Sequence, residues 1–250
     1  MAATVKEVLE ILRAFAPTEL ACSWDNVGLL VDAGRPVDRI LTTLDITAAA
    51  VEEAAAQGCQ LVVSHHPVIF NPLKRITMQD PAALLVRHGI SAICMHTNLD
   101  AAPGGVNDTL AGILGIQDTV SFAEGCGRIG TVAPTTAEKL ARLCAERLGS
   151  HPQFVEADRP VTRLAEVSGG GGSSLQEAID LGADCLVTGE AAHHIALLAR
   201  QMGVGLVVAG HWATEHPIAG VLADHLARAL PGVTVQTAAA DQDPLRTLQD

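Results

Sequence analysis

Apolar residues recur along the chain with two spacings, one typical of helices and one typical of buried strands. Residues 4–17 have them at helical spacing, and this segment ends at Pro17. Strands are predicted within 24–32, 39–47, 59–67 and 90–100, and helices at 47–58, 80–89 and 104–115. The alternation of strands with helices predicts an α/β fold with mainly parallel strands.

The same alternation restarts after Gly125. Strands are predicted within 128–134, 163–168, 183–190 and 204–211, and helices at 135–149, 173–182, 191–203 and 213–230. This restart indicates a second α/β domain that begins near residues 125–130. Ligands of such sheets gather at the carboxyl ends of the strands. The residues that fall at or just beyond strand ends in the first half are His65, His66, His96 and Asp100.

The composition narrows the range of functions. Hydrophobic residues make up 48% of the 250 positions, whereas aromatic residues make up only 2%, with no tyrosine. The core is therefore built from Ala, Val, Leu and Ile, and the scarcity of aromatics argues against a platform on which bases stack. A net charge of −12 argues against binding to duplex nucleic acid or to a membrane surface. Binding of a phosphorylated small molecule is compatible with this negative charge if metal ions supply the positive charge.

The six cysteines are scattered and form no C-x-x-C pair. Most lie in apolar runs, so we interpret them as buried, reduced thiols rather than as a disulfide or zinc framework. The chain shows neither a basic leader followed by an apolar run nor a long uncharged apolar segment. We therefore expect a cytoplasmic protein.

The motif SHHP at 64–67 is the strongest local signal. Adjacent strand residues point to opposite faces, so His65 and His66 can share a site only if the strand has ended. Pro67 makes such a turn plausible, because proline fixes its own φ and restricts the preceding residue. Neutral imidazole is a common metal ligand. A polar loop without a ligand is the alternative.

Two further motifs offer carboxylates. Asp100 follows the strand that leads into HTNLD (96–100), although it fits a turn or a helix N-cap equally well. In HWATEHP (211–217), His211 ends a strand, Thr214 is a natural N-cap and Glu215 then starts a helix. A carboxylate at a helix start is favourable without any metal, which is the alternative for Glu215.

Together, three strand ends offer a set of five candidate ligands: His65, His66, Asp100, His211 and Glu215. Mixed nitrogen and oxygen ligands suit Zn, Fe, Mn or Ni better than Ca. Five ligands are too many for one catalytic zinc, which usually takes three. They fit two divalent ions that share a bridging carboxylate, with water completing the shells.

Two more segments carry possible chemistry. SGGGGSS (168–174) lies between a strand and a helix, where it either presents backbone N–H groups to an anion or forms only a tight turn. TGEAAHH (188–194) places Glu190, His193 and His194 at a strand end and helix start. Glu190 is a candidate general base and His193 a candidate proton shuttle. Surface histidines on an amphipathic helix are the alternative.

The motifs SWDNVGLLVD, SHHPVIF, HTNLDAAPGGVND, TGEAAHH and GHWATEHP occur in this order. The set resembles the widespread dinuclear-metal-centre family of GTP cyclohydrolase 1 type 2 homologues, the NIF-three-like proteins. The resemblance spans nearly the whole chain, from about Trp24 to Pro217. It implies that His65 and His66 bind different ions, that Asp100 joins His66, that His211 joins His65, and that Glu215 bridges the two ions.

The resemblance also implies an architecture. Family members look like two α/β domains, with mainly parallel or mixed sheets flanked by helices, around a cleft with the metal site at strand carboxyl ends. The first domain would comprise residues 1–126 plus 210–250, and residues 127–209 would be an inserted second domain. The family assembles as a toroidal homohexamer.

Three functions are compatible with these features. The first is a dinuclear metal-dependent hydrolase of a nucleotide or related small molecule, similar to GTP cyclohydrolase 1 type 2, with cyclic amidines as the substrate class and GTP as a candidate. The second is a metal-binding or metal-delivery protein, and the third is a regulatory scaffold with structural metals. An open, water-bearing shell beside Glu190 and His193 favours the enzyme, whereas a closed shell favours the other two.

Overall fold

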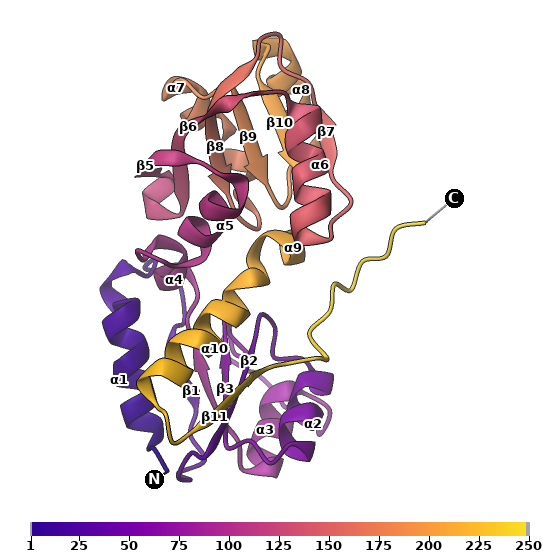
Figure 1. The fold of residues 1–250 in the computed structure, drawn as a ribbon. Coiled ribbons are helices and arrows are strands. Elements are labelled where there is room, and N and C mark those ends of the chain that lie inside the picture. Colours follow the sequence, from indigo (N-terminus) through magenta and orange to yellow (C-terminus); the bar gives the residue numbers. More distant parts are fainter. Residues whose placement is uncertain (1, 249–250) are drawn as a thin grey trace. The chain divides into compact units, whose positions relative to one another are not determined.

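The computed structural model describes residues 2–248 and divides into two compact units (Figure 1). The first unit comprises the residues up to Pro103 together with Ile218–Gln242. The second comprises Gly104–Pro217 together with the segment from Asp243 onward. The domains predicted from the sequence, 1–126 with 210–250 and 127–209, have other borders and stay a prediction.

The first unit contains a five-stranded sheet. Its strands, in spatial order, are β1 (Gly28–Val31), β4 (Ser91–Cys94), β3 (Leu61–Ser64), β2 (Arg39–Thr43) and β11 (Thr234–Thr237). All neighbouring pairs are parallel except β1 and β4. The helices of this unit are α1 (Val5–Phe15), η1 (Thr18–Leu20), α2 (Ala48–Ala56), α3 (Pro81–His88), α4 (Thr97–Ala101) and α10 (Pro217–Ala229).

Helices cover this sheet because consecutive strand residues point to opposite faces, and both faces carry apolar side chains. Leu41, Val62 and Ala92 lie side by side in register and belong to one buried cluster with residues of α2 and α3. Thr42 points the other way, and its hydroxyl donates to the Ala219 carbonyl of α10 at 2.8 Å. The central strands β2, β3 and β4 are thus buried on both faces, as parallel strands usually are.

The helix ends of the first unit follow local sequence rules. Thr4 and Glu7 form a reciprocal capping box at the start of α1. Asp80 is the N-cap residue of α3, although its side chain makes no capping hydrogen bond there. Gly89 closes α3 with a positive φ of 66°, a conformation that only glycine adopts without strain.

The second unit contains a six-stranded mixed sheet. Its strands, in spatial order, are β5 (Gln117–Phe122), β6 (Gly127–Thr135), β8 (Val161–Val167), β9 (Cys185–Thr188), β10 (Gly205–Val208) and β7 (Gln153–Val155). Of its neighbouring pairs, β8–β9 and β9–β10 are parallel, and the other three are antiparallel. The helices are α5 (Val106–Leu114), η2 (Ala123–Gly125), α6 (Ala137–Leu148), η3 (Gly171–Ser174), α7 (Leu175–Asp180), α8 (His193–Met202) and α9 (His211–Glu215).

The hydrophobic pattern predicts the central strands well but misses three strands at sheet edges. These are β5, β7 and β11, whose side chains are mostly exposed or half-buried. Edge strands with exposed, polar side chains give no apolar run, so pattern analysis has no signal to find them. The α/β class itself, with mixed sheets flanked by helices, is confirmed.

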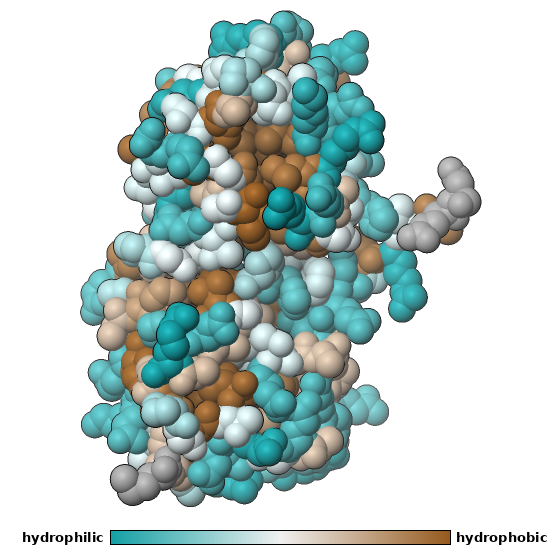
Figure 2. All heavy atoms as spheres, viewed as in Figure 1, coloured by the Kyte–Doolittle hydropathy of each residue, from teal (hydrophilic) through white to brown (hydrophobic). Residues whose placement is uncertain are grey.

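The surface and the thiols agree with the composition. Figure 2 shows hydrophobic patches set among hydrophilic atoms on the face in view. All six cysteines carry free thiols, as predicted, and burial raises the pKa of Cys144 to about 12. Among the described residues, every helix is too short or too polar to cross a bilayer.

Candidate metal centre

Two neighbouring parallel strands, β3 and β4, bring His65, His66 and His96 together at the carboxyl end of the sheet. Ser64 of β3 and Cys94 of β4 are paired in register, so the residues that follow each strand lie close together. The backbone N–H of His65 still bonds to the Thr43 carbonyl at 3.2 Å, and that of His66 bonds to Leu44 at 2.9 Å. The double histidine therefore lies where β3 ends, as the motif predicts.

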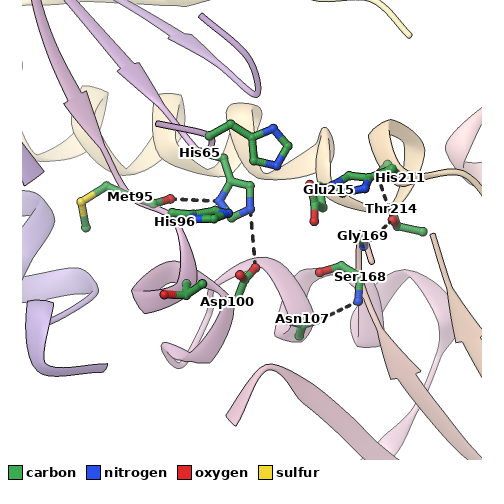
Figure 3. A network of polar contacts seen from close by, with 12 residues as sticks. His65, Met95, His96, Asp100, Asn107, Ser168, Gly169, His211, Thr214 and Glu215 are labelled. Atoms are coloured by element: carbon green, nitrogen blue, oxygen red, sulfur yellow. Dashed lines mark hydrogen bonds and ion pairs between the residues drawn. The ribbon is translucent and has the colours of Figure 1, made fainter. Parts of the chain in front are cut away.

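His65 is fully buried, and its ring orientation is fixed by a backbone acceptor (Figure 3). Its Nδ1 lies 2.9 Å from the Met95 carbonyl. A carbonyl only accepts hydrogen bonds, so Nδ1 carries the proton of the neutral ring and Nε2 carries the lone pair. Asp100 Oδ1 lies 3.6 Å from this Nε2. Two ligand atoms at this spacing suit a shared ion at about 2.0–2.2 Å from each.

His66 and His96 are oriented in the same way by carboxylates. Nδ1 of His66 lies 2.9 Å from Asp45 Oδ1, and Nδ1 of His96 lies 2.8 Å from Asp25 Oδ1. One ring nitrogen from each of His65, His66 and His96 lies within 4.8 Å of the others. Metal-binding histidines commonly donate their second nitrogen to a carboxylate or carbonyl. The first unit thus fits a divalent metal ion in both ligand type and ring orientation.

Asp25 is the most firmly held of these orienting groups. Its side chain is fully buried, and it accepts from His96, from the Thr97 N–H at 3.0 Å and from the Thr97 hydroxyl at 2.5 Å. Burial on its own raises the pKa of this carboxyl, but the hydrogen bonds from His96 and Thr97 outweigh it and hold the pKa well below its usual range. An ionised Asp25 keeps the proton of His96 on Nδ1.

Asp100 lies on a helix and not in the turn that the sequence suggested. It is the fourth residue of α4, a single turn that begins directly after His96. This helix is held by Asn98, whose amide donates to the Ala16 carbonyl at 2.8 Å. A helix of this length is too short to leave a periodic pattern, which explains the difference. Within this unit Asp100 Oδ1 lies 3.6 Å from His65 Nε2, whereas the resemblance pairs Asp100 with His66.

In the second unit, His211 and Glu215 share one face of the short helix α9. They are four residues apart, which brings side chains together on a helix, and His211 Nε2 lies 3.0 Å from Glu215 Oε2. The prediction that Thr214 is the N-cap before Glu215 is wrong, because α9 begins at His211 with Gly210 as its N-cap. Glu215 therefore stands at the end of α9, and the helix-start alternative for its charge does not apply to α9.

The glycine-rich loop packs directly against this pair. Gly169 has a φ of +55°, and a Cβ built there would lie 1.9 Å from Glu215 Oε1. Its N–H donates to the Thr214 hydroxyl at 3.0 Å (Figure 3). A Cβ on Gly189 would likewise lie 2.8 Å from the His211 Cα. These glycines are needed for close approach of the backbone to the candidate ligands.

The predicted catalytic residues lie in different surroundings. Glu190 Oε1 is 3.4 Å from His211 Nδ1, so Glu190 faces a candidate ligand. Glu190 and His194 line one cavity of about 520 Å³, whereas His193 lines another of about 380 Å³ against β7 and β10. The structure therefore brings Glu190 to His211 and places His193 in a separate cavity, and the catalytic roles stay predictions.

The residues that orient the ligands were not predicted from the sequence. Asp25, Asp45 and Gly169 are absent from the predicted set, and His96 had no assigned role. Asp25 lies in the motif SWDNVGLLVD, which signals the family but not a contact with a histidine 71 positions away. Such long-range partners become visible only when the strands are placed side by side.

The family profile of Duf34/NIF3 (NGG1p interacting factor 3) matches residues 3–244. The chain belongs to this family. It is 30% identical over 253 residues to the GTP cyclohydrolase 1 type 2 homolog of Clostridium acetobutylicum, covering 95% of this chain and 94% of that one. It is 33% identical to the protein NIF3 homolog of Schizosaccharomyces pombe, covering 96% of each chain.

A solved structure supports the same fold. The Bacillus cereus protein related to NIF3 superposes with a TM-score of 0.89 at 21% identity, covering 99% of each chain. At this identity the likeness concerns the fold alone. The family that the motifs indicated and the α/β fold class are thus confirmed.

Proposed function

We propose that this Duf34/NIF3 member is a dinuclear metal-dependent hydrolase that acts on a nucleotide or a related small molecule. The metal ligands are His65, His66, Asp100, His211 and Glu215. The observation that carries the proposal is the shared orientation of His65, His66 and His96, each of which donates from Nδ1 to an oxygen. Nothing in a purely structural role requires three imidazoles to be oriented alike.

The residues of the chain suit divalent Zn, Fe, Mn or Ni, because imidazole nitrogens and carboxylates are combined. Two such ions, when bound, would supply a hydroxide nucleophile near neutral pH. Glu215, in contact with His211, is the residue suited to bridge them. Glu190 is suited to accept a proton near the site and to orient His211.

The proposed substrate class is supported by the names of relatives and by the charge of the chain. Relatives carry the name GTP cyclohydrolase 1 type 2 homolog. That chemistry adds water to the purine C8 atom and opens the ring, which a cyclic amidine permits. With a net charge of −12, the protein itself offers little attraction for a triphosphate, so bound cations are suited to that task. We also propose a homohexameric assembly in the cytoplasm.

Metal analysis combined with turnover tests this function. We expect close to two ions per chain after reconstitution with Zn, Fe or Mn, and hydrolysis of GTP or another nucleotide by the wild type. Glu215→Gln should lose this hydrolysis, whereas Glu146→Gln, which alters an exposed carboxylate on α6, should retain it. Fewer than one ion per chain after reconstitution would refute the metal site. If metal binds and no nucleotide is turned over, a metal-binding or metal-delivery role replaces the enzyme.

A further inference from the structure

An exposed aromatic pair, Trp24 and Phe70, stands beside the histidines of the first unit. The whole chain has only two tryptophans and four phenylalanines. Trp24 is 61% exposed and Phe70 is 47% exposed. Their rings meet edge to face, with centroids 5.9 Å apart. Two of six scarce aromatic side chains are thus left largely in water at one place.

Both rings also contact His96. The centroid of His96 lies 6.3 Å from that of Trp24 and 6.3 Å from that of Phe70. The His96 ring in turn lies 5.2 Å from His65 and 5.5 Å from His66. The aromatic pair therefore adjoins the candidate metal ligands through a single imidazole.

The backbone that carries the pair is held in place on both sides. Asn26, two residues after Trp24, donates its amide to the Ile69 carbonyl at 2.5 Å, next to Phe70. Cys22, two residues before Trp24, donates its N–H to the Thr97 hydroxyl at 2.9 Å, and Asp25 is anchored to Thr97 and His96. The two exposed rings are thus presented by segments fixed to each other and to the histidine group, which lowers the entropy cost of binding a ligand.

We propose that Trp24 and Phe70 form a subsite that binds a planar heteroaromatic ring, such as a nucleobase, of the molecule whose reacting atoms meet the metal centre. This inference rests on the proposed function and specifies its substrate. Aromatic faces bind bases of any sequence because every base has a π-face. The low aromatic content argued against a stacking platform, but the structure gathers two of the few aromatics at the candidate site.

A small molecule fits the pair better than a protein partner. Each aromatic side chain buries about 150–250 Å², so the pair offers far less than the roughly 800 Å² per partner of a stable protein interface. The net charge of −12 also disfavours a nucleic-acid strand as the occupant. A free nucleotide or similar ring-bearing metabolite remains the occupant of matching size.

Calorimetric titration of the metal-loaded protein tests the subsite, with GTP, ATP and UTP as ring-bearing probes and inorganic tripolyphosphate as the probe without a ring. We expect at least one nucleotide to bind more tightly than tripolyphosphate. Trp24→Ala and Phe70→Ala should each lower the affinity for that nucleotide by about tenfold, which is the usual scale for loss of one stacking contact. Tripolyphosphate affinity should stay unchanged. Phe154→Ala, which removes a 46% exposed aromatic from the second unit, serves as the matched control.

Three outcomes would overturn the subsite. In the first, no nucleotide binds more tightly than tripolyphosphate. In the second, neither variant changes the affinity for the nucleotide. In the third, light scattering shows a changed oligomeric state in either variant, which would make the pair a subunit contact. The hydrolase proposal fails separately. If the variants weaken nucleotide binding but the wild type turns nothing over, the ring subsite stands and the hydrolase does not. If turnover persists with the same KM in Trp24→Ala, the reverse holds.

Discussion

The two units hold their candidate metal ligands by different means. In the first unit, the histidines follow the ends of parallel strands, and each ring is fixed by a hydrogen bond from Nδ1 to an oxygen. In the second unit, His211 and Glu215 lie on one short helix, and the backbone of a glycine-rich loop packs against them. Orientation thus depends on hydrogen-bond acceptors, two carboxylates and one backbone carbonyl, in the first unit and on the absence of side chains in the second.

The largest effect should come from adding one methyl group to the glycine-rich loop. In Gly169→Ala the new Cβ meets Glu215 Oε1 at 1.9 Å, and the positive φ adds backbone strain. Glu215 must move, so we expect metal affinity to fall by more than the roughly 10–100-fold that loss of an outer-shell partner costs. Metal content per chain after dialysis against a competing chelator measures this loss.

Gly170→Ala is the matched control for this substitution. It lies next to Gly169, has a negative φ, and has no atom within 4 Å of its added Cβ. Circular dichroism of both variants shows whether the fold is kept. If Gly169→Ala retains metal as well as Gly170→Ala does, the close approach of the loop has no role in placing Glu215.

A smaller effect is expected from an orienting carboxylate of the first unit. Asp45→Asn replaces the carboxylate that accepts from the His66 Nδ1–H by a neutral amide. An amide oxygen is a weaker acceptor than a carboxylate, so it stabilises this tautomer less. We expect metal affinity to fall by roughly 10–100-fold. Competition with a fluorescent zinc chelator measures the change.

The surface carboxylate of Asp38, in the same unit, provides the control through Asp38→Asn. It makes no contact with a histidine among the described residues. Equal affinities for the two variants would show that the Asp45 contact is incidental. The comparison of the units would then rest on the backbone contacts of Met95 and Gly169 alone.

The extent to which the site was predictable differs along the chain. His65 and His66 were visible because an apolar strand is followed by two imidazoles, and His211 because another apolar strand is followed by one. Asp100 was placed after a strand, although it lies on the one-turn helix α4, which is too short to show a helical period. Asp25 and Asp45 carry no local signal, because their meaning lies in contacts with histidines 71 and 21 residues away.

The glycine-rich segment shows a second reason for such limits. From the sequence, SGGGGSS fitted either an anion-binding loop or a turn, because glycine permits both. The close approach of Gly169 to Glu215 supplies a third explanation that depends on tertiary packing. Composition likewise shows that aromatic residues are scarce, but it gives no information on where Trp24 and Phe70 lie in the fold.

The smallest effect concerns the scaffold of the second unit rather than its ligands. Asp184 is buried and accepts from Arg159 at 2.7 Å, from the N–H groups of Thr162 and Arg163, both at 2.9 Å, and from the Thr162 hydroxyl at 3.0 Å. Burial on its own raises the pKa of Asp184, but these hydrogen bonds outweigh it and leave the pKa lowered. Asp184→Asn should therefore lower the free energy of unfolding by about 1–3 kcal/mol at pH 7.

The pH dependence of this difference gives the sharper measurement. A carboxyl whose pKa is lower in the folded protein stabilises the fold fully above its unfolded value of about 3.9 and loses that contribution as the pH falls through the folded value. The gap in urea midpoint between wild type and Asp184→Asn should thus shrink below about pH 4, whereas Asp180→Asn, at an exposed position on α7, should show no comparable gap at pH 7. A gap that stays constant down to pH 3 would mean that Asp184 acts through shape rather than charge. The second unit would then rely on packing in its scaffold as well as around its ligands.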